Sequence, residues 1–165
     1  ACENTDMEVT FFPSYGAQQR GGTANCYVVI SDSMIGTPAA DMVEDLIVMN
    51  KPSLKRFLGK LKSGGNLMVN SSIVTGKVER EDIHIIQVPV TEMALEMGNA
   101  KVLNLIMLGV YVGYTEILPP ELVLKTIEKK LRKRADLISI RQRFIGGWRL
   151  EKARKSGSKS EERNF

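Results

Sequence analysis

Five short runs rich in β-branched and aromatic residues predict strands, and longer runs of helically spaced apolar residues predict helices between and after them. The strand-like runs are residues 8–12, 26–32, 46–49, 66–70 and 83–88. The apolar spacing predicts a first helix over residues 53–61, which we expect Gly64 and Gly65 to end. Further helices are predicted over residues 92–97, with Thr91 as the cap, and over 102–114, 119–132 and 135–155.

This order of elements predicts an α/β protein. We expect a three-layer α/β/α fold in which helices cover both faces of a mostly parallel sheet. The length of 165 residues and the hydrophobic content of 43% suit one globular domain. We place this domain at residues 1–155 and expect a disordered basic tail at 156–165. Because the chain begins with Ala1 rather than Met, we interpret it as processed or as a fragment of a longer protein.

Composition and charge argue against several classes of protein. The longest apolar runs fall short of the ~20 residues that span a membrane. Cys2 and Cys26 are the only cysteines, too few for a disulfide framework or a metal site, so we expect a cytoplasmic protein. Residues 125–165 have 14 basic residues against 5 acidic ones, a net charge of +9. These charges interleave with apolar residues, as on solvated helix faces, so we expect no nucleic-acid partner. His84 is the only histidine and is expected to be a structural strand residue.

The connection between the first two predicted strands is the most distinctive segment of the chain. Its glycines can adopt positive φ angles and let another molecule approach the backbone closely. Arg20 directly precedes two glycines, a position that suits binding of a carboxylate or phosphate. The alternative is an ordinary polar connection with a solvated arginine. The residues we single out as a ligand-side loop are Tyr15, Gly16, Arg20, Gly21, Gly22 and Thr23.

Small polar residues follow two of the later predicted strands. Asn50 comes after the strand at 46–49, and Asn70 and Ser71 lie at the end of the next one. Ligands collect at the carboxyl ends of parallel strands, so these residues are predicted to line a strand-end groove. Each of them by itself is also typical of a local cap or turn. The residues form no recognisable catalytic set, and the catalytic residues stay unknown.

Several different short motifs follow one another along the chain. Pro13-Ser14-Tyr15-Gly16 is followed by Arg20-Gly21-Gly22-Thr23-Ala24-Asn25-Cys26, then by Met49-Asn50-Lys51-Pro52-Ser53 and Val69-Asn70-Ser71-Ser72. Val88-Pro89, Thr91-Glu92 and Glu96-Met97-Gly98-Asn99 continue the series. Together they resemble the gamma subunit of 2-oxoacid:ferredoxin oxidoreductases, over roughly residues 8 to 150. The family usually opens with a strand and a Gly-Gly-Gln-Gly loop. That segment is absent from this sequence, so contacts that depend on it are not assigned.

The resemblance implies a Rossmann-like fold, similar to the gamma domain of pyruvate:ferredoxin oxidoreductase. It also implies oxidative decarboxylation of a 2-oxoacid with coenzyme A, which gives an acyl-CoA, carbon dioxide and reduced ferredoxin. Thiamine diphosphate, Mg²⁺ and iron–sulfur clusters would belong to the whole complex, and we assign no cofactor to this chain alone. The implied partners are alpha and beta subunits that bind thiamine diphosphate, a small ferredoxin-like subunit, and ferredoxin as electron acceptor.

The motif at the first connection favours 2-oxoglutarate or a branched-chain 2-oxoacid over pyruvate as substrate. We expect the chain to be inactive alone and to act as one subunit. Two alternatives stay open: a purely structural subunit that holds the thiamine subunits together, and a free-standing module that binds a nucleotide or coenzyme A.

Overall fold

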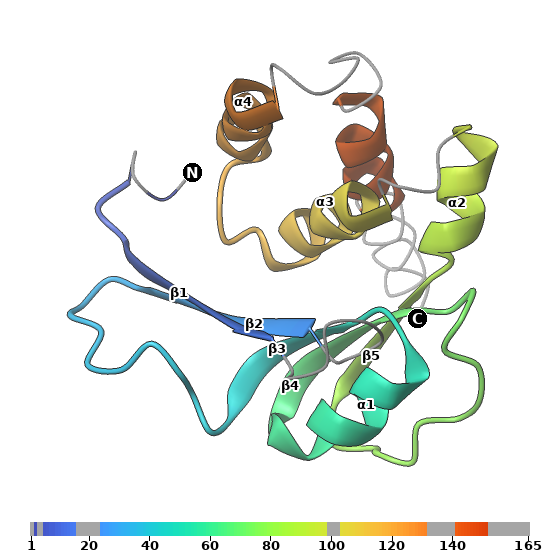
Figure 1. Ribbon diagram of the computed structural model, residues 1–165, viewed down its shortest axis with the longest axis horizontal. Helices are drawn as coiled ribbons and strands as arrows, with labels where there is room; N and C mark the ends of the chain where they lie inside the picture. The colour runs from blue at the N-terminus through green and yellow to red at the C-terminus, as the bar shows by residue number, and fades with distance from the viewer. Residues whose placement is uncertain (1, 3–4, 16–23, 99–102, 132–140, 152–165) are drawn as a thin grey trace, which may run out of the picture. The chain divides into compact units, whose positions relative to one another are not determined.

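The computed structural model describes residues 2, 5–15, 24–98, 103–131 and 141–151 (Figure 1). The chain divides into two compact units. The first contains residues 1–69 and 74–86, and the second contains residues 70–73 and 87–165. The predicted disordered tail at 156–165 lies outside the described residues.

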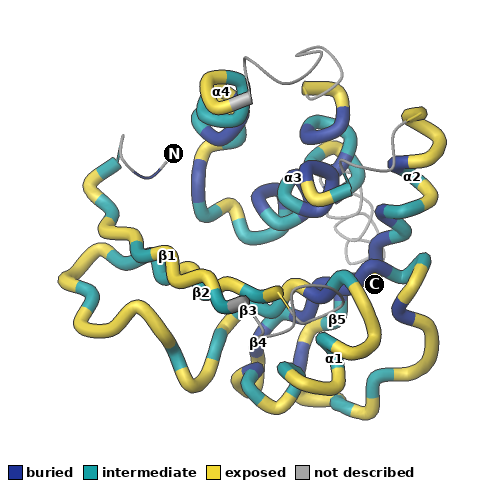
Figure 2. The backbone as a smooth tube through the Cα atoms, viewed as in Figure 1, coloured by how far each residue is buried: buried dark blue, intermediate teal, exposed yellow. Residues whose placement is uncertain are grey.

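The first unit begins with an antiparallel hairpin of β1 (Glu8–Tyr15) and β2 (Ala24–Ser31), which forms a two-stranded sheet of its own. Glu8 lies opposite Ser31, and Tyr15 lies opposite Ala24. β1 extends three residues beyond its predicted end and includes Pro13. A proline is tolerated here because β1 pairs with β2 on one side only. Edge strands accept proline, since the N–H groups on their other side have no strand to bond. Figure 2 shows the hairpin as mostly exposed or half-buried.

A parallel sheet follows, with the strand order β3 (Val43–Val48), β4 (Leu61–Asn70) and β5 (His84–Val88). β3 and β4 pair in parallel and are connected through helix α1 (Lys51–Phe57) and the 3₁₀ turn η2 (Leu58–Lys60). Two backbone hydrogen bonds connect the β4 and β5 segments: Gly64 N–H donates to Asp82 O (2.6 Å), and Ser71 N–H donates to Val88 O (2.9 Å). From the first bond to the second, the residue numbers rise on both segments. β5 is therefore also parallel to β4. The predicted α/β class with a parallel sheet is confirmed.

The prediction that Gly64 and Gly65 end the first helix is wrong, because both glycines lie inside β4. The helix ends earlier, at Phe57. The register shifts between Val43 and Asp45 of β3, so the segment of β4 around the glycines forms an irregularity in the ladder. Gly64 has φ 75°, and a Cβ atom on Gly65 would lie 2.7 Å from the carbonyl oxygen of Glu44. Glycine is required here for conformation and for close approach of the strands.

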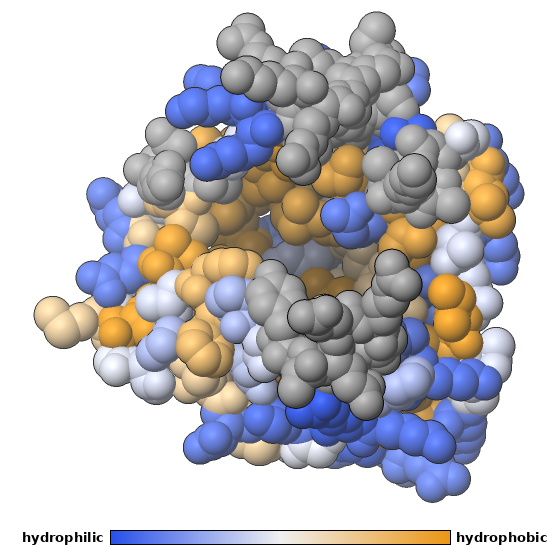
Figure 3. All heavy atoms as spheres, in the orientation of Figure 1, coloured by the Kyte–Doolittle hydropathy of each residue, from blue (hydrophilic) through white to orange (hydrophobic). Residues whose placement is uncertain are grey.

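The core of the first unit lies between the parallel strands and α1. Its buried members come from β3, β4 and the segment that leads to β5, and Leu46, Leu54 and Leu58 pack against them. Figure 3 shows hydrophilic residues along the lower margin, where α1 lies, in agreement with its exposed Lys51, Lys55 and Arg56. α1 is therefore amphipathic, as its leucine spacing predicts. The buried core residues are Val48, Leu61, Leu67, Val69, Val74 and Ile83.

The second unit is mainly helical. Its helices are α2 (Val90–Glu96), α3 (Leu103–Thr115) and α4 (Pro120–Leu131), and residues 141–151 form a further helix. α3 has seven buried residues, in accordance with a sequence that is apolar on all sides. The prediction that Thr91 caps the helix after β5 is wrong, because α2 begins at Val90 and no side chain caps it.

Glycines allow α3 and the 141–151 helix to approach each other closely. A Cβ atom on Gly109 would collide with the carbonyl oxygen of Phe144, and one on Gly147 would collide with the carbonyl oxygen of Ile106. Gly113 faces Trp148 in the same way, with the added carbon 3.1 Å from its carbonyl oxygen. The two helix backbones are therefore packed against each other without intervening side chains.

Candidate functional site

The predicted ligand-side loop is closed by the hairpin at both of its ends. Tyr15 is the last residue of β1 and pairs with Ala24, the first residue of β2. The register therefore brings the two ends of the connection side by side. Gly16, Arg20, Gly21, Gly22 and Thr23 themselves lie outside the described residues, and their role as a ligand-side loop stays a prediction.

Asn50 serves as the N-cap of α1. Its Oδ1 atom accepts a hydrogen bond from the backbone N–H of Ser53 (2.9 Å). This leaves the amide nitrogen of the exposed Asn50 side chain for other contacts. Asn50 lies in the first unit, whereas Asn70 and Ser71 lie in the second.

Asn70 ends β4 and is fully buried, with a relative exposure of 0%. Its Nδ2 atom donates to Oγ1 of Thr91 (2.9 Å), and its Oδ1 atom is buried without a hydrogen-bond partner among the described residues. The backbone N–H of Ser71 donates to the carbonyl of Val88, which ends β5. Ser72 Oγ accepts a longer bond from the N–H of Glu92 (3.4 Å). The carboxyl ends of two neighbouring parallel strands thus converge at a small polar cluster, which we call the strand-end cluster: Asn70, Ser71, Ser72 and Thr91.

The bond between Thr91 and Asn70 was not predicted from the sequence. The two residues are 21 positions apart, and no local pattern relates them. Only the parallel pairing of β4 with β5 brings them together. The sequence did indicate this region, because polar residues follow each of the two strands at its carboxyl end.

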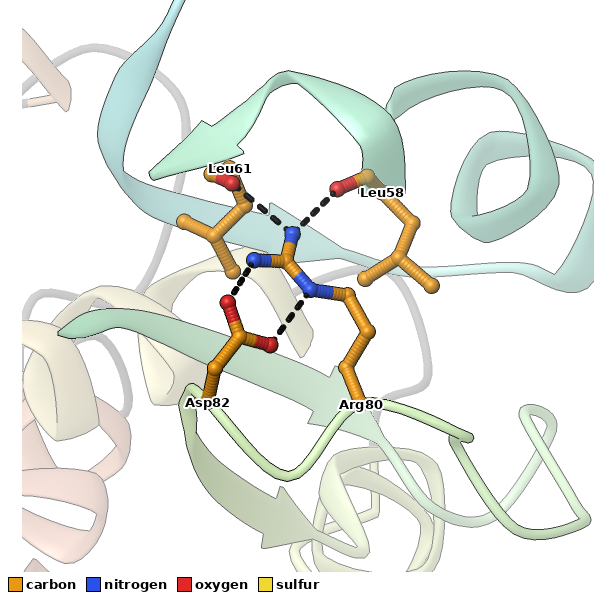
Figure 4. Close-up of polar contacts among 4 residues, drawn as sticks. All are labelled: Leu58, Leu61, Arg80 and Asp82. Carbon is orange, nitrogen blue, oxygen red and sulfur yellow. Dashed lines mark hydrogen bonds and ion pairs between the residues drawn. The ribbon is translucent and has the colours of Figure 1, made fainter. Parts of the chain in front are cut away.

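A second polar arrangement that the sequence did not reveal is the clamp of Arg80 and Asp82 (Figure 4). Arg80 donates from Nε and Nη2 to the two carboxylate oxygens of Asp82, at 2.9 and 2.5 Å. Its Nη1 atom donates to the carbonyls of Leu58 (3.1 Å) and Leu61 (2.8 Å). Hydrogen bonding from Arg80 lowers the pKa of Asp82 from 3.8 to about 2.

The clamp is a structural device of the first unit. Four of the five N–H groups of an arginine are used here within the protein. The guanidinium connects the segment before β5 to the first residue of η2 and the first residue of β4. A surface depression of about 480 Å³ is lined by residues 77–82, but its arginine has little donor capacity left for a ligand.

The described residues contain no group of three or more His, Cys, Asp or Glu side chains that could hold a metal ion. Cys2 is buried and Cys26 is exposed, both as free thiols. His84 begins β5 and is exposed. Within the described ranges, none of the helices is long and apolar enough to cross a membrane.

The parallel sheet and the helices that follow its strands define an α/β protein, and in this class of fold ligands commonly bind at the carboxyl ends of the strands. Residues 1–141 match the family described as pyruvate ferredoxin/flavodoxin oxidoreductase, and the chain belongs to this family. The resemblance drawn from the sequence motifs is confirmed. Two relatives are named ketoisovalerate oxidoreductase subunit VorA. The one from Methanothermobacter marburgensis is 39% identical over 101 residues, and the one from Methanothermobacter thermautotrophicus is 38% identical.

These matches cover 61% of this chain but 21% of each VorA relative, so the chain spans about a fifth of their length.

The fold of this chain is similar to those of several solved structures. The gamma subunit of a keto/oxoacid ferredoxin oxidoreductase from Geobacter sulfurreducens has a TM-score of 0.74 at 23% identity, covering 89% of this chain and 82% of that one. Pyruvate oxidoreductase subunit PORC from Thermotoga maritima has a TM-score of 0.68 at 25% identity, covering 87% and 79%.

A third solved structure is the 2-oxoglutarate:ferredoxin oxidoreductase from Magnetococcus marinus, with 2-oxoglutarate, coenzyme A and succinyl-CoA bound. Its TM-score is 0.80 at 20% identity, covering 89% of this chain and 26% of that one. At this identity the likeness shows the fold alone. This protein therefore has the fold found in subunits of oxoacid oxidoreductases.

Proposed function

We propose that the chain is the gamma component of a multi-subunit 2-oxoacid:ferredoxin oxidoreductase. The complex would convert a 2-oxoacid and coenzyme A to acyl-CoA, carbon dioxide and reduced ferredoxin. The observation that carries this proposal is the family match over residues 1–141, together with the series of motifs between Pro13 and Asn99. We infer a cytoplasmic enzyme that is inactive as a single chain.

The proposed partners are alpha and beta subunits, a small ferredoxin-like subunit and ferredoxin. The sequence has two cysteines, whereas an iron–sulfur cluster takes four protein ligands. The residues of this chain therefore do not fit a cluster, and we assign the clusters, like thiamine diphosphate and Mg²⁺, to the other subunits. The basic segment 125–165, with a net charge of +9, is suited to an acidic surface such as that of a ferredoxin.

We favour a branched-chain 2-oxoacid or 2-oxoglutarate as the substrate. The names of the two VorA relatives support the branched-chain alternative. Coenzyme A is proposed to lie against the connection with Arg20, because an arginine in a glycine-rich segment can bind phosphate groups in a bidentate manner. Tyr15, Gly16, Gly21, Gly22 and Thr23 complete this proposed loop. Asn50 in the first unit, and Asn70 and Ser71 in the second, stay proposed strand-end residues.

Purification of the complex through a tag on this chain tests the proposal. The preparation should contain thiamine-dependent subunits and reduce a dye only when a 2-oxoacid and coenzyme A are both supplied. A panel of 2-oxoacids then identifies the substrate. A lone, inactive protein that is stabilised by nucleotides would contradict the proposal and favour a nucleotide-binding module.

Arg20→Ala tests the role of the loop, with the neighbouring Gln19→Ala as its matched control. We expect Arg20→Ala to raise the KM for coenzyme A about tenfold or more, since it removes a charge-assisted hydrogen bond. Gln19→Ala should leave the KM within about twofold of the wild-type value. If both variants assemble and keep the wild-type KM, the loop does not bind coenzyme A.

A further inference from the structure

The strand-end cluster contains a hydrogen-bonding arrangement whose direction is fixed by a buried residue. Asn70 Nδ2 donates to Thr91 Oγ1. A hydroxyl oxygen that accepts a bond still carries its own hydrogen, and that hydrogen must point elsewhere. Thr91 is half-buried, so its hydroxyl hydrogen can reach a molecule at the edge of the sheet.

In the structure the donor is Asn70 Nδ2 and the acceptor is Thr91 Oγ1. Rotation of the amide would reverse the bond, so that Thr91 donates to the carboxamide oxygen and both amide hydrogens are unpaired in place of one hydrogen and the oxygen. A buried polar group without a partner destabilises the fold. The side chain of Asn70 is fully buried, and its Oδ1 atom has no partner among the described residues.

Ser72 repeats the same arrangement beside Thr91. Its Oγ atom accepts from the N–H of Glu92 (3.4 Å), which also leaves the hydroxyl hydrogen free to donate. Ser72 is half-buried like Thr91. Two hydroxyl donors therefore lie on one edge, after the carboxyl ends of β4 and β5, where parallel sheets bind their ligands.

We propose that Thr91 and Ser72 form a donor pair that binds an oxygen atom of the ligand, and that Asn70 is the positioning residue that turns the Thr91 hydroxyl outward. The acceptor is a carbonyl, carboxylate or phosphate oxygen. This inference rests on the proposed function, in which coenzyme A and a 2-oxoacid both carry such oxygens. Asn70 is too deeply buried to contact the ligand itself.

The test uses the assembled complex and three variants. Thr91→Val removes the hydroxyl and keeps the shape of the side chain. Asn70→Leu has a side chain of similar size and removes the donor, so the Thr91 hydroxyl is no longer held in its outward orientation. Thr91→Ser keeps a hydroxyl and should restore binding. Thr126→Val is the matched control, because the Thr126 hydroxyl donates to the carbonyl of Leu122 within α4 (2.9 Å).

We expect Thr91→Val and Asn70→Leu to weaken the binding of one ligand about fivefold, the effect of one neutral hydrogen bond, with kcat within about twofold of wild type. Separate KM values for coenzyme A, dephospho-coenzyme A and the 2-oxoacid show which molecule supplies the oxygen. Calorimetric titration of coenzyme A into the complex provides a readout independent of turnover. Thr91→Ser and Thr126→Val should behave like wild type.

Unchanged KM values and affinities in an assembled Thr91→Val complex would overturn this inference and leave the proposed function intact. The same holds if Thr91→Val and Thr126→Val lower thermal stability and kinetic constants equally, since the hydroxyl is then merely structural. Failure of the wild-type complex to turn over any 2-oxoacid with coenzyme A would instead reject the proposed function, and this inference with it.

Discussion

Substitution of Gly147 by alanine tests the close packing of α3 against the 141–151 helix. The added methyl group would collide with the carbonyl oxygen of Ile106 and lie 3.1 Å from the backbone nitrogen of Val110. Both obstacles are backbone atoms of a buried helix, so neither can rotate away as the tip of a side chain can. The two helices must therefore move apart to accommodate the methyl group.

Two effects of opposite sign determine the outcome. Alanine is favoured over glycine inside a helix by about 1 kcal/mol, whereas overpacking of a well-packed core costs about 1–3 kcal/mol or more. Because the contact is with backbone, we take the upper part of this range and expect a net loss of about 1–2 kcal/mol in the free energy of unfolding. For a chain of this size, that lowers Tm by roughly 2–8 °C.

Thermal unfolding followed by circular dichroism, together with urea titration, measures the effect. Gly59→Ala is the matched control, because no atom lies within 4 Å of the added carbon there. It should leave stability unchanged or raise it slightly. A Gly147→Ala protein as stable as wild type would contradict this prediction, since helix propensity would then outweigh the collision and the helices could not be as close as described.

Three further predictions concern polar residues of the first unit. The folded-state pKa of Asp82, about 2, lies below its usual 3.8. The stabilisation from its bond with Arg80 should therefore be complete above about pH 4 and be lost as pH falls towards 2, so urea titrations should distinguish Asp82→Asn from wild type at pH 7 but not at pH 2. Lys62→Met should change stability by less than about 0.5 kcal/mol, because its ion pair with Glu44 (2.9 Å) lies on the surface. Asn50→Ala should cost about 1 kcal/mol through loss of the helix cap, whereas Asn50→Asp, which keeps an acceptor oxygen, should be close to neutral. A larger loss in Asn50→Asp than in Asn50→Ala would contradict the capping role.

Most secondary structure could be predicted from the sequence, because it depends on residues near one another in the chain. The prediction placed the strand now seen at His84–Val88 and the helix at Leu103–Thr115 within one residue at each end. It failed where tertiary contacts override local preference. A pair of glycines such as Gly64 and Gly65 is typical of the end of a helix, but both residues lie in β4, the strand that pairs with β3.

The candidate site was predictable only in part. The sequence singled out Asn50, Asn70 and Ser71 by their position after strands. It could not distinguish the helix cap of Asn50 from the buried amide of Asn70, because burial depends on what packs above each strand end. Thr91 was interpreted as a helix cap, whereas the structure shows it as the acceptor of the Asn70 amide.

The strands and helices of this α/β protein, and its family, could be predicted from local patterns and from motifs in a fixed order. Which distant residues meet depends on the packing of the whole chain. Asn70 bonds Thr91, Arg80 bonds the carbonyls of Leu58 and Leu61, and Gly147 contacts the backbone of Ile106. Each of these contacts joins residues about 20 to 40 positions apart. Such contacts depend on strand order and helix packing, which arise from burial of the whole apolar surface rather than from any short segment.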